Sequence, residues 1–151
     1  MATTTATITL SSTDILSNAI SLSKTSTLYD DSSTSTGLTQ CTMGKVNVYV
    51  TGSSFNLINA TVNAEDQTQY AYIANKNTTA ANYITISIYN EVIGKLYAGD
   101  WMFIPWNASD PVGDNGADND IEVEAFVGGP QAVEYAVFTE TAATNLDASG
   151  D

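Results

Sequence analysis

Residues 82–106 read NYITISIYNEVIGKLYAGDWMFIPW, and residues 120–138 read DIEVEAFVGGPQAVEYAVF. Within the first stretch, Ile84, Ile86 and Ile88 alternate with polar or aromatic residues, and the second stretch shows the same period of two. This period puts successive side chains on opposite faces of a β-strand. Because turn residues separate the alternating segments, the two stretches predict consecutive antiparallel strands, each with one solvent-facing side and one core-facing side.

Similar alternation recurs along most of the 151-residue chain. With the strand at 84–88, strands are expected over residues 3–10, 14–23, 46–50, 55–62, 70–73, 93–97, 101–104, 121–127 and 133–138. Residues 3–10 could instead be an arm that pairs with a neighbouring chain, and residues 14–23 also show helical spacing, although their serine content favours a strand. Pro105 has no backbone N–H to donate, so the strand before it must end there or lie at the edge of a sheet. About nine or ten short strands are typical of a sandwich or a barrel. We expect an all-β fold, an antiparallel β-sandwich of the jelly-roll type with an extended N-terminal arm.

The segment over residues 23–44, SKTSTLYDDSSTSTGLTQCTMG, is polar and rich in Ser, Thr and Gly. It is long for a loop inside a compact domain, which favours an arm that docks elsewhere through Leu28, Tyr29, Leu38 and Met43. The expected regions are an N-terminal part with strands and the Ser/Thr-rich arm (1–44), a sandwich body (45–138) and a polar C-terminal tail (139–151).

The charge of the chain excludes several classes of partner. There are 17 acidic residues, 4 lysines, no arginine and no histidine, for a net charge of -13. Such a charge repels nucleic acid and anionic lipid, and arginine, the usual residue for phosphate and base recognition, is missing. No apolar run approaches the roughly 20 residues that span a bilayer, and the N-terminus lacks the features of a secretory signal. We expect neither nucleic acid nor membrane as a partner.

Enzymatic chemistry has little support in the residues. Without histidine no Ser-His-Asp or Cys-His pair can form, and Cys41, the only cysteine, cannot make an internal disulfide. Glu122 and Glu124 share one face of a strand about 6.6 Å apart, a spacing compatible with a carbohydrate hydrolase. Strand alternation already explains both glutamates, so we expect no enzyme and no cofactor.

A weak calcium candidate lies in the acidic stretch 107–120, where Asp114, Asp118 and Asp120 offer oxygen ligands. Their spacing does not match an EF-hand, since Gly116 stands where a ligand is needed and no Glu occupies the twelfth position. An acidic surface turn is the simpler interpretation, and we expect no metal.

Aromatic residues near one predicted hairpin, Tyr89, Tyr97, Trp101 and Trp106, suggest sugar stacking as an alternative. However, the run from Trp101 to Ile104 is apolar at every position, which fits a strand that is apolar on both faces. A core or subunit-interface role is therefore favoured. The expected interface residues are Leu28, Tyr29, Leu38, Trp101, Phe103 and Trp106.

Several segments taken together resemble small structural proteins of tailed bacteriophages, especially those that infect marine cyanobacteria. These segments are TATITLSSTDILSNAISLS, STSTGLTQ, YIANKNTTAANYITISI, IGKLYAGDWMFIPW and AVEYAVF. The sharpest part is KLYAGDWMFIPW at residues 95–106, whereas residues 46–62 lie outside the resemblance. None of these segments is catalytic, so no functional residue can be transferred.

The resemblance implies a virion protein made in the host cytoplasm, and a capsid decoration (cement) protein on the outer surface of a phage head. The expected partners are the major capsid protein or other virion proteins, and the expected homo-oligomer is small, with a trimer favoured. The alternative is a tail or fibre module that binds host surface glycan. The pattern from Ala98 to Pro105 is also similar to a jelly-roll turn of cupins, but cupins hold metal through histidines, which this chain lacks.

Overall fold

A computed structural model describes residues 4–13, 20–28, 40–50, 52–60, 69–106, 119–126 and 129–139. Over these ranges the chain forms antiparallel β-strands, and none of them contains an α-helix. The strands are β1 (Thr4–Ser12), β2 (Ile20–Leu28), β3 (Gln40–Val48), β4 (Phe55–Ile58), β5 (Gln69–Asn75), β6 (Tyr83–Ile88), β7 (Glu91–Tyr97), β8 (Trp101–Trp106), β9 (Ile121–Phe126) and β10 (Gln131–Thr139). The chain divides into two compact units, residues 1–39 and 40–151. The described part holds no helix long and apolar enough to cross a membrane.

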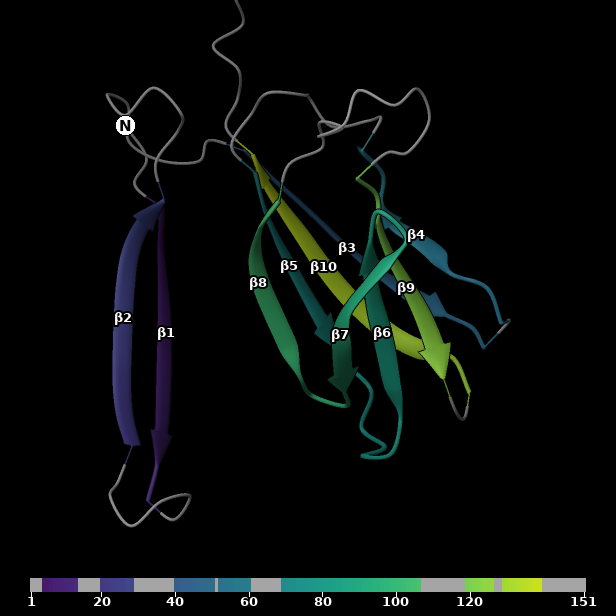
Figure 1. The fold of residues 1–151 in the computed structure, drawn as a ribbon, viewed down its shortest axis with the longest axis horizontal. Coiled ribbons are helices and arrows are strands. Elements are labelled where there is room, and N and C mark those ends of the chain that lie inside the picture. Colours follow the sequence, from purple (N-terminus) through teal and green to yellow (C-terminus); the bar gives the residue numbers. More distant parts are fainter. Residues whose placement is uncertain are drawn as a thin grey trace, which may run out of the picture. The chain divides into compact units, whose positions relative to one another are not determined.

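The second unit is a sandwich of two four-stranded sheets, ordered β3-β10-β5-β8 and β4-β9-β6-β7 (Figure 1). Strand pairing explains this order: β6 pairs with β7, β5 with β8, β4 with β9 and β3 with β10, all antiparallel. The eight strands therefore form one long hairpin whose tip is the β6–β7 turn. Rolling up that hairpin places its pairs alternately in the two sheets, which is the jelly-roll arrangement. The expected antiparallel β-sandwich is confirmed.

Two tight turns set this topology. At the tip, Tyr89 and Asn90 both have positive φ, at 55° and 60°, as a two-residue hairpin turn that follows the strand twist requires. The turn from β7 to β8 carries the chain from one sheet to the other, and Gly99 has a φ of 87° there. The Asp100 carboxylate accepts a hydrogen bond from the Tyr97 N–H at 3.0 Å, which holds this corner.

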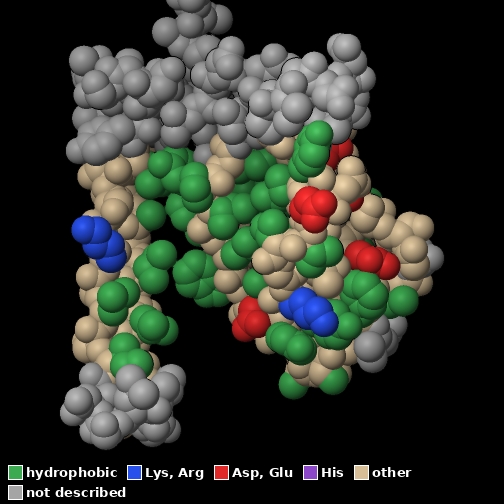
Figure 2. Space-filling view, viewed as in Figure 1, with side chains coloured by type: hydrophobic (Ala, Val, Ile, Leu, Met, Phe, Trp, Pro, Cys, Tyr) green, Lys and Arg blue, Asp and Glu red, His purple; other side chains and the backbone are tan. Residues whose placement is uncertain are grey.

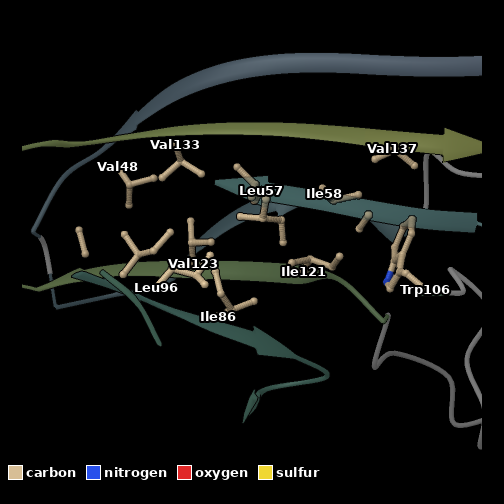
Figure 3. Packing of buried hydrophobic residues seen from close by; sticks show 14 of the residues in the cluster. Val48, Leu57, Ile58, Ile86, Leu96, Trp106, Ile121, Val123, Val133 and Val137 are labelled. Atoms are coloured by element: carbon tan, nitrogen blue, oxygen red, sulfur yellow. The ribbon is translucent and has the colours of Figure 1, made fainter. Parts of the chain in front are cut away.

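The core lies between the sheets and is built from the alternating apolar residues (Figure 3). Ile84 and Ile86 point inward and are completely buried, as the period of two predicts. From the facing sheet, Val48, Val133 and Val137 contribute to the same core. The fifteen buried members are Val48, Leu57, Ile58, Ala60, Ala71, Ile73, Ile84, Ile86, Leu96, Trp106, Ile121, Val123, Ala125, Val133 and Val137.

The polar segment 23–44 differs from the expected arm at both of its ends. Residues 23–28 complete β2, and residues 40–44 begin β3, so the body starts at Gln40. Low hydrophobicity suggested a loop there, but Ser and Thr fit a pleated surface, and β10 pairs with β3 along its whole length. Residues 29–39, like the tail 140–151, lie outside the described residues. Pro105 is accommodated because β8 is an edge strand.

The first unit is a hairpin in which β1 and β2 pair without a bulge. Its two faces differ sharply in chemistry. One face carries hydroxyl side chains at every position of the pairing, and two cross-strand contacts join them, Thr7 to Thr25 at 2.8 Å and Thr9 to Ser23 at 3.3 Å. The hydroxyl face consists of Thr5, Thr7, Thr9, Ser11, Ser21, Ser23, Thr25 and Thr27. The other face is apolar along its middle but also carries polar residues, and it consists of Thr4, Ala6, Ile8, Leu10, Ser12, Ile20, Leu22, Lys24, Ser26 and Leu28.

Gly44 gives a direct test of the β3–β10 pairing. It lies opposite Tyr135, and a Cβ at Gly44 would come within 2.5 Å of the Tyr135 ring. Gly44→Ala is expected to lower the free energy of unfolding by about 1–3 kcal/mol, because the ring must leave its position. Gly94→Ala is the matched control in β7, since its Cβ would meet nothing within 4 Å. Urea unfolding measures both, and equal losses would contradict the packing at Gly44.

Candidate interaction surface

The outer side of the β3-β10-β5-β8 sheet is apolar. Because Ile73 and Val133 point into the core, their neighbours along each strand point outward. Figure 2 shows hydrophobic side chains gathered over this part of the body. We name the following set the aromatic face: Cys41, Met43, Tyr70, Tyr72, Ala74, Trp101, Phe103, Pro105, Ala136 and Phe138.

Cross-strand ring contacts organise the aromatic face. Tyr70 and Phe103 stack with centroids 5.4 Å apart and an interplanar angle of 3°. Phe103 also meets Phe138 edge-on at 6.0 Å, and Tyr72 lies 6.3 Å from Trp101. Side chains stand roughly perpendicular to a sheet, so rings stacked across strands present their edges outward. In the stacked pair, Tyr70 and Phe103 each turn one flat face toward the other ring.

Charge is sparse on this side of the sandwich. Among its described residues only Lys45 and Glu134 are charged, and they are register partners on β3 and β10. Trp101 is 53% exposed, and Met43 is also exposed. Large contiguous apolar surfaces are often found at binding sites, because leaving them in water costs free energy. The aromatic face is therefore the candidate interaction surface.

The opposite sheet, β4-β9-β6-β7, has an outer side that agrees with the expected solvent-facing pattern. Glu122 and Glu124 alternate there with the buried residues of β9. A small aromatic cluster at one end includes Tyr83 and Phe126, stacked at 5.3 Å, and the Lys95 ammonium lies 4.5 Å from the Tyr83 ring. The two outer sides thus differ in charge more than in apolar content. This side carries Glu122, Glu124 and Lys95 among exposed apolar residues such as Ile93 and Tyr97, whereas the described residues of the other side include only Lys45 and Glu134 as charged groups.

The carboxylate pair lies on the outer side of the β4-β9-β6-β7 sheet. Glu122 stands between Asn56 and Ser87 in the strand register, and Glu124 stands beside Thr85. A cavity of about 360 Å³ opens instead between β3 and β4. Its lining contains no carboxylate and consists of Thr42, Asn56, Leu57, Ile58, Asn59, Tyr135 and Val137.

The calcium candidate is only partly described. Asp114 and Asp118 lie outside the described residues, while Asp120 precedes β9. The Asp120 carboxylate accepts hydrogen bonds from the Ala60 N–H at 2.7 Å and from the Asn56 side-chain amide. Asp120 thereby joins the end of β4 to the start of β9. Over the described ranges, no cluster of three or more metal-binding side chains occurs.

The expected interface residues separate in the structure. Trp101 and Phe103 lie on the aromatic face, whereas Trp106 is buried in the core and donates its Nε1–H to the Asn119 carbonyl at 2.8 Å. Leu28 ends β2, and the other two expected residues, Tyr29 and Leu38, lie outside the described part of the chain.

The aromatic residues near the predicted hairpin do not come together in the structure. Tyr97 lies on the outer side of the β4-β9-β6-β7 sheet, Trp101 lies on that of the other sheet, and Trp106 is in the core. The chain changes sheets between Tyr97 and Trp101, so closeness in sequence does not bring these side chains together. Sequence reasoning also missed Tyr70, Tyr72 and Phe138, whose alternation with buried residues was the available signal.

Cys41 reports on the polarity of the aromatic face. It lies opposite Phe138 in the β3–β10 register, and desolvation raises the pKa of its thiol. Alkylation of the folded protein by iodoacetamide should therefore rise with pH through a higher midpoint than alkylation of the urea-unfolded chain, because only the thiolate reacts. Mass spectrometry of the labelled protein measures both midpoints. Coincident midpoints would contradict a desolvated thiol.

Neither models of known protein families nor curated protein sequences give a match to this chain.

Proposed function

We propose that the protein is a non-enzymatic virion component, a decoration (cement) protein that docks through the aromatic face on the outer surface of a tailed-phage head. The observation that carries this proposal is the difference between the two outer sides of the jelly roll. The β4-β9-β6-β7 side carries Glu122, Glu124 and Lys95 beside a small aromatic cluster, whereas the aromatic face spans all four strands of its sheet with one charge of each sign. A body with one broad, sparsely charged aromatic side is suited to lie flat on another protein through that side.

The charge of the chain supports a place outside the shell. With 17 acidic residues, 4 lysines and no arginine, the protein gains nothing from contact with packaged DNA. A net charge of -13 also keeps the exposed side solvated and discourages nonspecific association between particles. The phage assignment itself depends on the resemblance of segments such as KLYAGDWMFIPW, and the major capsid protein is the partner that this resemblance implies.

Recognition of host glycan by a tail or fibre module is the second candidate. The exposed Trp101 favours it, because an accessible indole can stack on a sugar ring. Two features favour a protein partner instead. Tyr70 and Phe103 stack on each other and offer edges, and the aromatic face has few polar groups that could bind sugar hydroxyls.

Particle composition tests the proposal. Virions of the phage that carries this chain would be purified by density gradient, and the protein would be counted against the major capsid protein by quantitative mass spectrometry. A decoration protein should band with filled heads in many copies per particle. Presence in the lysate with absence from purified particles would overturn the proposal. A few copies per particle, together with glycan binding lost in Trp101→Ala, would support the tail or fibre module instead.

A further inference from the structure

The outer edge of β1 has the character of a pairing surface. In the described part of the chain, β1 pairs only with β2, so its other edge faces no strand. Residues 5–11 of this edge contain no proline, glycine or charged residue, and the register with β2 has no bulge. Proteins usually protect a free edge with such features, because its backbone N–H and C=O groups bind any available strand.

The hairpin also lacks the support that a two-stranded sheet needs. A hairpin alone is marginally stable in water, and three or more strands with an apolar face are needed for independent stability. Along its apolar face, Ile8, Leu10 and Leu22 are 48%, 58% and 53% exposed. An added strand would meet the backbone requirement and widen this face at the same time.

We propose that β1 of one copy pairs antiparallel with β1 of a second copy, around a two-fold axis at Ile8. Ile8 then lies opposite Ile8 of the second copy, and Thr7 opposite Thr9. Even-numbered residues meet even-numbered ones across this axis, so both faces keep their chemistry: hydroxyls beside hydroxyls and apolar side chains beside apolar ones. The product is a four-stranded sheet, β2-β1-β1-β2, with an isologous contact.

The position of Lys24 favours this arrangement over the alternative, a closed ring of hairpins in which β1 of each copy pairs with β2 of the next. Lys24 lies in the middle of β2 on the apolar face, opposite Ile8. If β1 of each copy paired with β2 of the next, three hairpins could close into a barrel with all three Lys24 side chains inside, where an unpaired charge is costly. In the two-fold sheet β2 stays outermost, and Lys24 reaches water around the edge. The hairpin therefore favours a dimer over the trimer expected from the sequence.

Charge also favours contact at the hairpin. Lys24 is the single charged residue in the described parts of this unit, residues 4–13 and 20–28, whereas the whole chain carries -13. Two copies that meet through β1 bring together segments with little charge, so the contact itself adds little electrostatic repulsion.

Disulfide trapping tests the pairing on the full chain. In a Cys41→Ser background, Ile8→Cys should give a disulfide-linked dimer under mild oxidation, because directly opposed residues of antiparallel strands lie within disulfide reach. Lys24→Cys is the matched control on the same face and should stay unlinked. Cross-linking between an Ile8→Cys chain and a Lys24→Cys chain would indicate the ring of hairpins and overturn the proposal.

Sedimentation gives a second readout that needs no cysteine. The unsubstituted protein should sediment as a dimer. Thr7→Lys with Thr9→Lys should shift it to monomer, since like charges would lie directly opposite across the axis. Ser23→Lys with Thr25→Lys adds the same charge to β2 and should leave the dimer intact. A monomeric unsubstituted protein would refute the pairing. Both experiments use free protein, so they succeed or fail independently of docking on a particle.

Discussion

Replacing Trp101 with alanine is expected to reduce incorporation of the protein into virions by about 30-fold or more. Trp101 is the most exposed ring of the aromatic face, and tryptophan is among the residues that contribute most at protein interfaces. Loss of one such residue costs about 2 kcal/mol or more, which corresponds to about 30-fold in affinity. Stability should change far less, because the side chain already contacts water in the free protein.

The measurement is a competition inside infected cells. A tagged variant is expressed during infection, and its ratio to the untagged protein is compared between purified particles and lysate. Tyr97→Ala is the matched control, because Tyr97 is similarly exposed, at 47%, on the outer side of the opposite sheet. Equal incorporation of the Trp101 variant and the unsubstituted protein would show that the aromatic face does not dock on the particle.

Replacing Asn75 with alanine is expected to lower the free energy of unfolding by about 2–4 kcal/mol. Asn75 is completely buried at the end of β5, and its side chain links the two sheets. The Asn75 amide donates to the Leu96 carbonyl of β7 at 3.1 Å, and its Oδ1 accepts from the Asn77 N–H at 3.0 Å. Alanine removes both bonds and leaves a buried carbonyl without its donor.

Asn77→Ala is the control against which the loss of unfolding free energy in Asn75→Ala is compared. Asn77 accepts one hydrogen bond from the Thr79 N–H at 2.9 Å in an exposed turn, so its loss should cost no more than about 1 kcal/mol. Chemical unfolding of both variants, followed by circular dichroism, measures the difference. Similar losses for the two variants would show that Asn75 does not join the sheets.

Alternation along single strands predicted most of the body. The inward positions of Ile84, Ile86, Val123 and Val133 follow from period two alone, because a sheet buries one side of each strand. The polar character of 23–28 and 40–44 misled the assignment there. Strand formation in these segments depends on the partner strand, which local composition does not reveal.

The aromatic face could not be predicted as a unit for a related reason. Tyr70, Phe103 and Phe138 come from β5, β8 and β10, and only the order of strands in the sheet makes them neighbours. The run at residues 101–104 is apolar at every position, so both faces of this strand are expected to be apolar. The sequence therefore places Trp101 and Phe103 either in a core or at an interface. The strand register then decides which residues of this run point outward.

The corner between β7 and β8 connects the two sheets at one side of the sandwich and leaves the opposite side open. At this corner the Gly99 N–H donates to the Asn75 carbonyl at 2.8 Å and the Asn75 N–H donates to the Asp100 carbonyl at 3.0 Å, so the corner is held against the end of β5. The open side lies between the edge strands β3 and β4, where the cavity is found. We therefore expect local opening of the sandwich to begin at β4, the shortest described strand, and to reach the β7–β8 corner last.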